Sequence, residues 1–129
     1  MDVKKEGRPT TAELEILNVI WKHGPSTVRF VNDQLSKGKE VGYTTTLKIM
    51  QIMAEKGLLT RDESQRSHLY GAAAPEAKVQ KQLLDRLLDQ AFGGSALKLV
   101  MQALGGQQAT PEEIASIRQL LDRMEGGEK

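Results

Sequence analysis

The spacing of apolar residues predicts three helices in the first half of the chain. Within residues 10–23, 26–35 and 43–56, apolar side chains recur three and four residues apart, which is the period of a helix that buries one face. Thr10 and Glu13 are spaced as a capping box at the start of the first helix. Ser26 is expected to cap the second helix.

The third predicted helix carries small polar residues on the side that faces away from its apolar positions. At 100° per residue, the apolar side holds Thr46, Ile49, Met50 and Met53, the opposite side holds Thr44, Lys48, Gln51 and Glu55, and Thr45, Leu47 and Ile52 lie at the flanks. The outer face of a surface helix normally carries long charged side chains, so a threonine-rich outer face indicates that a partner approaches closely. We interpret this helix as the recognition helix of a helix-turn-helix that enters the DNA major groove.

A β-hairpin is predicted directly after the third helix. Gly57 is placed to end that helix, and two short strand-like stretches, 58–61 and 68–72, flank the polar turn 62–67. Three helices followed by a hairpin is the winged-helix plan, in which the hairpin forms the wing. We therefore predict a winged-helix DNA-binding domain over residues 10–72, preceded by a flexible arm at residues 1–9.

Three further helices are predicted between residues 76 and 125. The pairs Gly93-Gly94 and Gly105-Gly106 separate them, and Thr110-Pro111 gives the last one a strong start signal. Their wide apolar faces cannot easily satisfy one another within about 50 residues, so we expect a helical dimerisation domain. The alternative is that these helices fold back onto the winged helix. The residues expected at the dimer contact are Leu83, Leu87, Leu88, Ala91, Leu97, Val100, Ile117, Leu120 and Leu121.

The predicted fold class is mainly α with a small β-hairpin, consisting of an N-terminal winged helix-turn-helix and a C-terminal three-helix dimerisation region. The 129 residues are 39% hydrophobic and 27% charged, which is ordinary for a globular protein. No apolar run reaches the roughly 18 residues of a membrane span, and the N-terminus has no signal-peptide core. We expect a cytoplasmic protein without membrane insertion.

Charge and cysteine content narrow the function classes. Residues 1–72 hold 11 lysines and arginines against 9 acidic residues, whereas residues 73–129 hold 7 against 8. The N-terminal part is therefore only slightly more positive than the rest, so DNA binding would depend on where its individual cations lie. The chain has no cysteine and only two histidines, so no metal site and no cofactor are predicted.

No pattern typical of an enzyme is present. The sequence lacks a Ser-His-Asp order, an HExxH motif, a P-loop and a paired-carboxylate constellation, and its glycine pairs are not placed between a strand and a helix. The remaining alternative to a DNA-binding protein is a winged-helix adaptor that binds another protein without sequence-specific DNA binding.

The chain resembles the penicillinase-repressor family of BlaI/MecI-type transcriptional repressors over nearly its whole length. The resemblance is carried by residues 11–17 with Trp21, by 24–29, by Tyr43-Thr44-Thr45 with Lys56-Gly57-Leu58, and by 66–70. It implies a homodimer whose winged helices bind a palindromic DNA operator and block transcription of antibiotic-resistance or stress-response genes.

The chain departs from the pattern of the family at three places. Leu47 and Ile52 stand where other members often carry polar or basic groups. Members controlled by a sensor-linked protease are cut at an Asn-Phe bond, which aligns with Val100-Met101 here. The cysteine-rich metal motif of copper-responsive relatives is absent.

Candidate DNA contacts follow from the predicted helix-turn-helix. Base contacts are assigned to Thr44, Thr45, Lys48 and Gln51, because hydroxyl, ammonium and amide groups can bind base edges. Backbone contacts are assigned to Arg29, Tyr43, Arg66, Ser67 and His68. For Arg29 and His68 the alternative is an ordinary solvated side chain, and for Trp21 a core anchor is favoured over stacking on a base.

Overall fold

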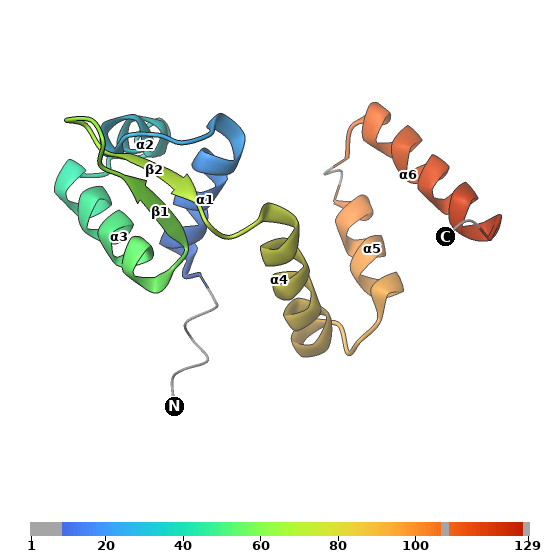
Figure 1. Cartoon of the computed structure of the whole chain (residues 1–129). Coiled ribbons are helices and arrows are strands. Elements are labelled where there is room, and N and C mark those ends of the chain that lie inside the picture. Colours follow the sequence, from blue (N-terminus) through green and yellow to red (C-terminus); the bar gives the residue numbers. More distant parts are fainter. Residues whose placement is uncertain (1–8, 107–108, 128–129) are drawn as a thin grey trace. The chain divides into compact units, whose positions relative to one another are not determined.

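The computed structural model describes residues 9–106 and 109–127. The chain divides into two compact units, Met1–Lys81 and Gln82–Lys129, which are described separately. The elements are α1 (Thr11–His23), α2 (Val28–Leu35), α3 (Tyr43–Lys56), β1 (Leu59–Asp62), β2 (Leu69–Ala72), α4 (Glu76–Ala91), α5 (Ala96–Gly105) and α6 (Pro111–Glu125) (Figure 1). The prediction of a mainly helical fold with one hairpin is confirmed. The predicted arm falls largely on residues 1–8, which lie outside the described residues.

The helix starts of the first unit follow the capping rules, with one correction. Thr10 caps α1 and forms the expected capping box with Glu13. The prediction that Ser26 caps the second helix is wrong, since Thr27 is the cap and its hydroxyl accepts from Phe30 N at 3.1 Å. Ser26 instead exchanges two backbone hydrogen bonds with Tyr70, of 2.8 and 3.0 Å. This bridge fixes Ser26 in an extended conformation next to β2, one residue before the cap.

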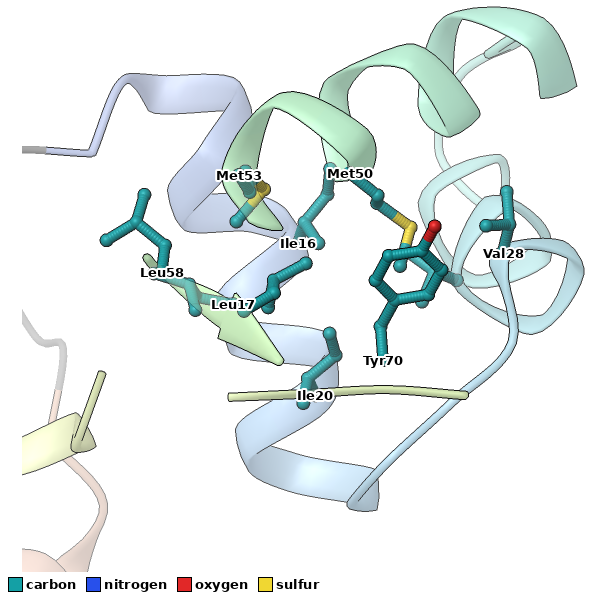
Figure 2. Packing of buried hydrophobic residues seen from close by; sticks show 10 residues of the cluster. Ile16, Leu17, Ile20, Val28, Met50, Met53, Leu58 and Tyr70 are labelled. Carbon is teal, nitrogen blue, oxygen red and sulfur yellow. The ribbon is translucent and has the colours of Figure 1, made fainter. Parts of the chain in front are cut away.

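One hydrophobic core joins α1, α2, α3 and the hairpin. Figure 2 shows Ile16 and Leu17 of α1 facing Met50 and Met53 of α3, with the Tyr70 ring of β2 beside Met50. Tyr70 is 2% exposed and the other four are fully buried. The hairpin therefore packs its inner face against a core that it shares with α3.

An asparagine fixes the connection between α2 and α3. Asn32 Nδ2 donates to the carbonyl of Val41 and to Thr46 Oγ1, both at 2.9 Å. Thr46 is fully buried, so its hydroxyl needs an internal partner. These two bonds set the position of the start of α3 relative to α2, despite a connection longer than a tight helix-turn-helix turn.

An ion pair joins the first turn of α1 to the last turn of α3. Lys56 Nζ lies 2.8 and 3.0 Å from the two carboxylate oxygens of Glu13, and the Glu13 side chain is only 6% exposed. Because Glu13 also accepts from Thr10 N at 2.9 Å, one carboxylate both caps α1 and holds the far end of α3. Glu13 is the buried acidic residue that the apolar pattern alone did not predict.

The hairpin follows α3 without a linker. Gly57 ends α3 with φ of +85°, a left-handed conformation that favours glycine, and β1 begins two residues later. The strands pair antiparallel, with Leu59 opposite Ala72 and Asp62 opposite Leu69. Trp21 Nε1 donates to the Ala74 carbonyl at 2.9 Å, so the tryptophan is half-buried against the chain that leaves β2.

The second unit has helices but no buried side chain among its described residues. Ser95 caps α5, and Thr110 caps α6 in a capping box with Glu113. Leu97 and Met101 are 68% and 63% exposed. No helix over residues 9–106 and 109–127 combines the length and apolarity that crossing a membrane requires.

Candidate nucleic-acid interface

The outer face of α3 is open to a partner. Thr44, Thr45, Lys48 and Gln51 are all exposed, whereas Thr46 on the opposite side is buried. The N-cap of α3 is Gly42, which has no side chain to accept from the first-turn amides. Free amides at a helix N-terminus favour an anionic group such as phosphate. The start of α3 thus presents hydroxyl groups and backbone donors together.

A groove of about 740 Å³ lies between α2, α3 and the wing. Six of the nine predicted DNA-contact residues line it, although they come from three separate parts of the sequence: Arg29, Tyr43, Gln51, Arg66, Ser67 and His68. The three others, Thr44, Thr45 and Lys48, lie on α3 outside this groove. The fold therefore gathers the predicted backbone contacts beside the predicted recognition helix.

Arg29 and Tyr43 form a contact that orients both side chains. The guanidinium carbon of Arg29 lies 5.1 Å from the centre of the Tyr43 ring, which is a cation–π distance. Arg29 is exposed and Tyr43 is 42% exposed. The pair places a cation and a phenolic hydroxyl side by side at the first turns of α2 and α3.

The wing residues lie in a loop and not in a strand. We predicted that the returning strand begins at His68, but β2 begins only at Leu69, so His68 lies in the loop with Arg66 and Ser67. All three side chains are exposed. The amide of Ser64 donates to Asp62 Oδ1 at 2.9 Å, and this bond, together with the Ser64 hydroxyl, holds the pKa of Asp62 below its usual value. The Asp62 side chain at the end of β1 thus fixes the start of the loop through its hydrogen bond with Ser64.

Arg61 is a groove residue that the sequence analysis did not assign. It lies on β1 directly opposite Tyr70, and both residues line the groove. Hydrogen bonding to the Tyr70 hydroxyl, followed by the charge of Glu63, raises the pKa of Arg61 above its usual value. The alternation along β1 could have indicated Arg61, because it shares a face with the buried Leu59.

The charge around the groove is locally positive. Arg29, Arg61 and Arg66 line it together with one acidic residue, Asp33, even though the net charge of the whole chain is only +1. Across the part of the chain that the structure describes, no three histidine, aspartate or glutamate side chains cluster as metal ligands. The groove is suited to bind an anionic backbone.

Three helices, a hairpin packed on the third, and a cationic groove between them define a winged helix-turn-helix protein. A family model described as penicillinase repressor matches residues 9–123. The chain belongs to the penicillinase-repressor family, whose members are transcriptional regulators and not enzymes.

Individual relatives are similar over almost the same span. The chain is 26% identical to a penicillinase repressor of Bacillus licheniformis over 127 residues, covering 98% of this chain and 99% of that protein. It is 21% identical to a penicillinase repressor of Staphylococcus aureus, covering 92% and 94%. Identity to the transcriptional regulator BlaI of Mycobacterium tuberculosis is 25%, covering 89% and 83%. The resemblance deduced from the sequence is confirmed.

Proposed function

We propose that this chain represses transcription as a homodimer that binds a palindromic DNA operator. The observation that carries the proposal is the groove, which collects six predicted DNA-contact residues beside the exposed face of α3. In each subunit α3 lies in the major groove, and bound protein blocks access to the promoter. The names of the relatives, which include a methicillin resistance regulatory protein, favour antibiotic-resistance genes as targets.

The exposed face of α3 supplies the sequence-specific contacts. Thr44 and Thr45 can hydrogen-bond a base edge or place a methyl group against thymine, Lys48 can bind a guanine edge, and the Gln51 amide is suited to adenine. Gln51 also lines the groove. Gln51 therefore lies between the proposed base contacts on α3 and the proposed backbone contacts in the groove.

The backbone contacts come from the groove walls. Arg29 and Tyr43 form one wall through their cation–π contact. Arg66, Ser67 and His68 form the other wall in the wing loop. Phosphate contacts on both sides of α3 fix the register of the helix on the duplex, and they make the affinity strongly dependent on salt.

The second unit supplies the dimer contact. No described side chain from Gln82 onward is buried, so the three helices have no core of their own. The proposed contact residues are Leu83, Leu87, Leu88, Ala91, Leu97, Val100, Ile117, Leu120 and Leu121. A two-fold dimer requires half-sites separated by about one helical turn or a small multiple of it.

A sensor-linked protease is a candidate partner for the relief of repression, although Val100-Met101 replaces the Asn-Phe bond that is cut in other family members. The bond aligned with the family cleavage site, Val100-Met101, lies within α5, and these side chains are 43% and 63% exposed. Incubation with the purified protease would test it, with a single cut in α5 as the supporting result.

Selection of duplexes from a random DNA library, followed by footprinting on the selected site, tests the proposed function. We expect an inverted repeat and two protected half-sites. Recovery of no enriched sequence would contradict sequence-specific repression and would favour the winged-helix adaptor. A duplex with the same composition and a scrambled repeat is the matched control.

A further inference from the structure

Arg61 lies between two grooves of the winged helix. It lines the larger groove with Arg29 and Arg66, and it also lines a second groove of about 520 Å³ with Gln51, Ala54, Glu55, Leu59 and Glu63. The second groove follows the C-terminal half of α3 along β1. A cation at this place is positioned to bind a DNA strand that passes between the recognition helix and the wing.

The guanidinium of Arg61 is held by two neighbours. Its Nε lies 2.6 Å from Glu63 Oε2, and the Tyr70 hydroxyl is the first of the groups that raise its pKa. Tyr70 lies directly opposite Arg61 in the hairpin and is 2% exposed, so this neighbour of Arg61 is fixed in the core. Glu63, in contrast, lies in the wing loop beyond β1 with its side chain 52% exposed, and it can turn away into solvent.

We propose that Arg61 is a phosphate-binding residue of the DNA interface and that the Glu63 carboxylate competes with the DNA backbone for it. This inference rests on the proposed function. A carboxylate and a phosphate offer the same paired oxygen acceptors to a guanidinium. DNA binding therefore exchanges the Arg61–Glu63 pair for an Arg61–phosphate pair.

The exchange costs little because the ion pair is exposed. Arg61 and Glu63 side chains are 38% and 52% exposed, and such pairs contribute little stability in water. The competitor nevertheless lowers the affinity for every duplex, since its negative charge must leave before phosphate arrives. Glu63 thus weakens binding to DNA of any sequence, and specific binding depends correspondingly more on α3.

The proposal is tested by measuring the affinity of the full chain for a mixed-sequence DNA duplex of about 30 base pairs. Fluorescence anisotropy gives this affinity over a range of KCl concentrations. Glu63→Gln should tighten binding about two- to fivefold at low salt. Glu55→Gln is the matched control, because Glu55 lines the same groove and its substitution changes the net charge equally.

Arg61→Gln should weaken binding and reduce the slope by about one. In the Arg61→Gln background, Glu63→Gln should give no more gain than Glu55→Gln. Two results would overturn the competition. One is an equal gain in DNA affinity from Glu63→Gln with and without Arg61, and the other is an equal gain from Glu63→Gln and Glu55→Gln. Either result would show that the carboxylate weakens DNA binding only by general charge repulsion. Far-UV circular dichroism confirms that each variant is folded.

The failure of this inference differs from the failure of the proposed function. If the unmodified chain binds duplex DNA and Glu63→Gln changes nothing, the competition is wrong while DNA binding stands. If the unmodified chain binds no duplex even at low salt, the proposed function fails and the competition falls with it.

Discussion

At the scale of single residues, burial separates side chains that hold the domain from those that can meet DNA. On α3, Thr46 is fully buried and hydrogen-bonded by Asn32, whereas its neighbours Thr44 and Thr45 are exposed. Three consecutive threonines therefore have two different roles. The helical period predicts this difference in burial correctly, since a step of 100° separates adjacent side chains.

Lys48 is the residue of α3 whose loss should affect operator binding most directly. Its side chain is exposed one turn beyond Thr44, so Lys48→Ala should lower operator affinity by roughly 1–3 kcal/mol without changing stability. A gel shift at fixed salt with the selected operator measures this. Lys22→Ala, on α1 and away from the groove, is the control, and equal constants for Lys48→Ala and the unmodified chain would remove Lys48 from the interface.

Glu13 should contribute more to stability than a surface carboxylate. Glu13→Gln keeps an acceptor for Thr10 N but removes the carboxylate that pairs with Lys56. Because the Lys56 side chain is only 25% exposed, we expect a loss of about 1–3 kcal/mol in the free energy of unfolding. Urea denaturation measures the change. Glu15→Gln is the matched control, because Glu15 pairs with Lys39 at the surface, where a loss below about 1 kcal/mol is expected. Similar small losses in both variants would contradict the role given to Glu13.

At the scale of elements, the angle between α2 and α3 depends on a polar anchor as well as on apolar packing. The connection from Ser36 to Gly42 has no regular structure, and Asn32 bonds its last part through the Val41 carbonyl. A longer turn would otherwise let α3 shift against α2. The anchor keeps the exposed face of α3 aligned with the groove.

Asn32→Leu should destabilise the first unit and weaken DNA binding together. The substitution leaves the buried Thr46 hydroxyl without its donor, while the Val41 carbonyl still accepts from Ser36 Oγ at 3.3 Å, so we expect a loss of about 1–3 kcal/mol for the threonine. Thr46→Val in the Asn32→Leu background should recover part of that loss, because both polar partners are then apolar. Urea denaturation of the single and double variants forms the cycle, and additive losses would show that the two side chains do not interact.

Tyr70 of β2 joins the hairpin to the rest of the first unit. Tyr70 packs into the core, pairs with Arg61 across the hairpin and bridges to Ser26. Its two backbone bonds to Ser26 form an isolated β-bridge beside the hairpin. The orientation of the wing loop thus depends on a residue that the sequence analysis noted only as part of the returning strand.

At the scale of the whole molecule, the two units differ in how they bury apolar surface. The first unit has a shared core of ten buried apolar residues, whereas the described helices after Lys81 bury none. An isolated unit without a core is not stable in water. A second copy of the chain is the simplest source of the missing surface.

The chain should sediment as a dimer at micromolar concentration. Its monomer mass is 14.2 kDa, so sedimentation velocity separates the two states clearly. Leu87→Glu, in the apolar stripe of α4 where Leu87 is 46% exposed, should shift the equilibrium toward the monomer because a charge would have to be buried at the contact. Glu76→Gln at the start of α4 is a control that should stay dimeric. A single monomeric species for the unmodified chain would refute the dimer.

The sequence by itself determined the elements, the helix boundaries other than the start of α2, and the exposed face of α3, because caps, glycines and helical periodicity are local properties of the chain. The spacing of motifs was also enough to indicate the family. Only the tertiary structure decided which distant residues meet. Three features depend on contacts between distant parts of the chain: the Ser26–Tyr70 bridge, the Glu13–Lys56 ion pair and the position of Arg61 between two grooves. Packing in three dimensions brings these residues together, and local sequence patterns do not encode it.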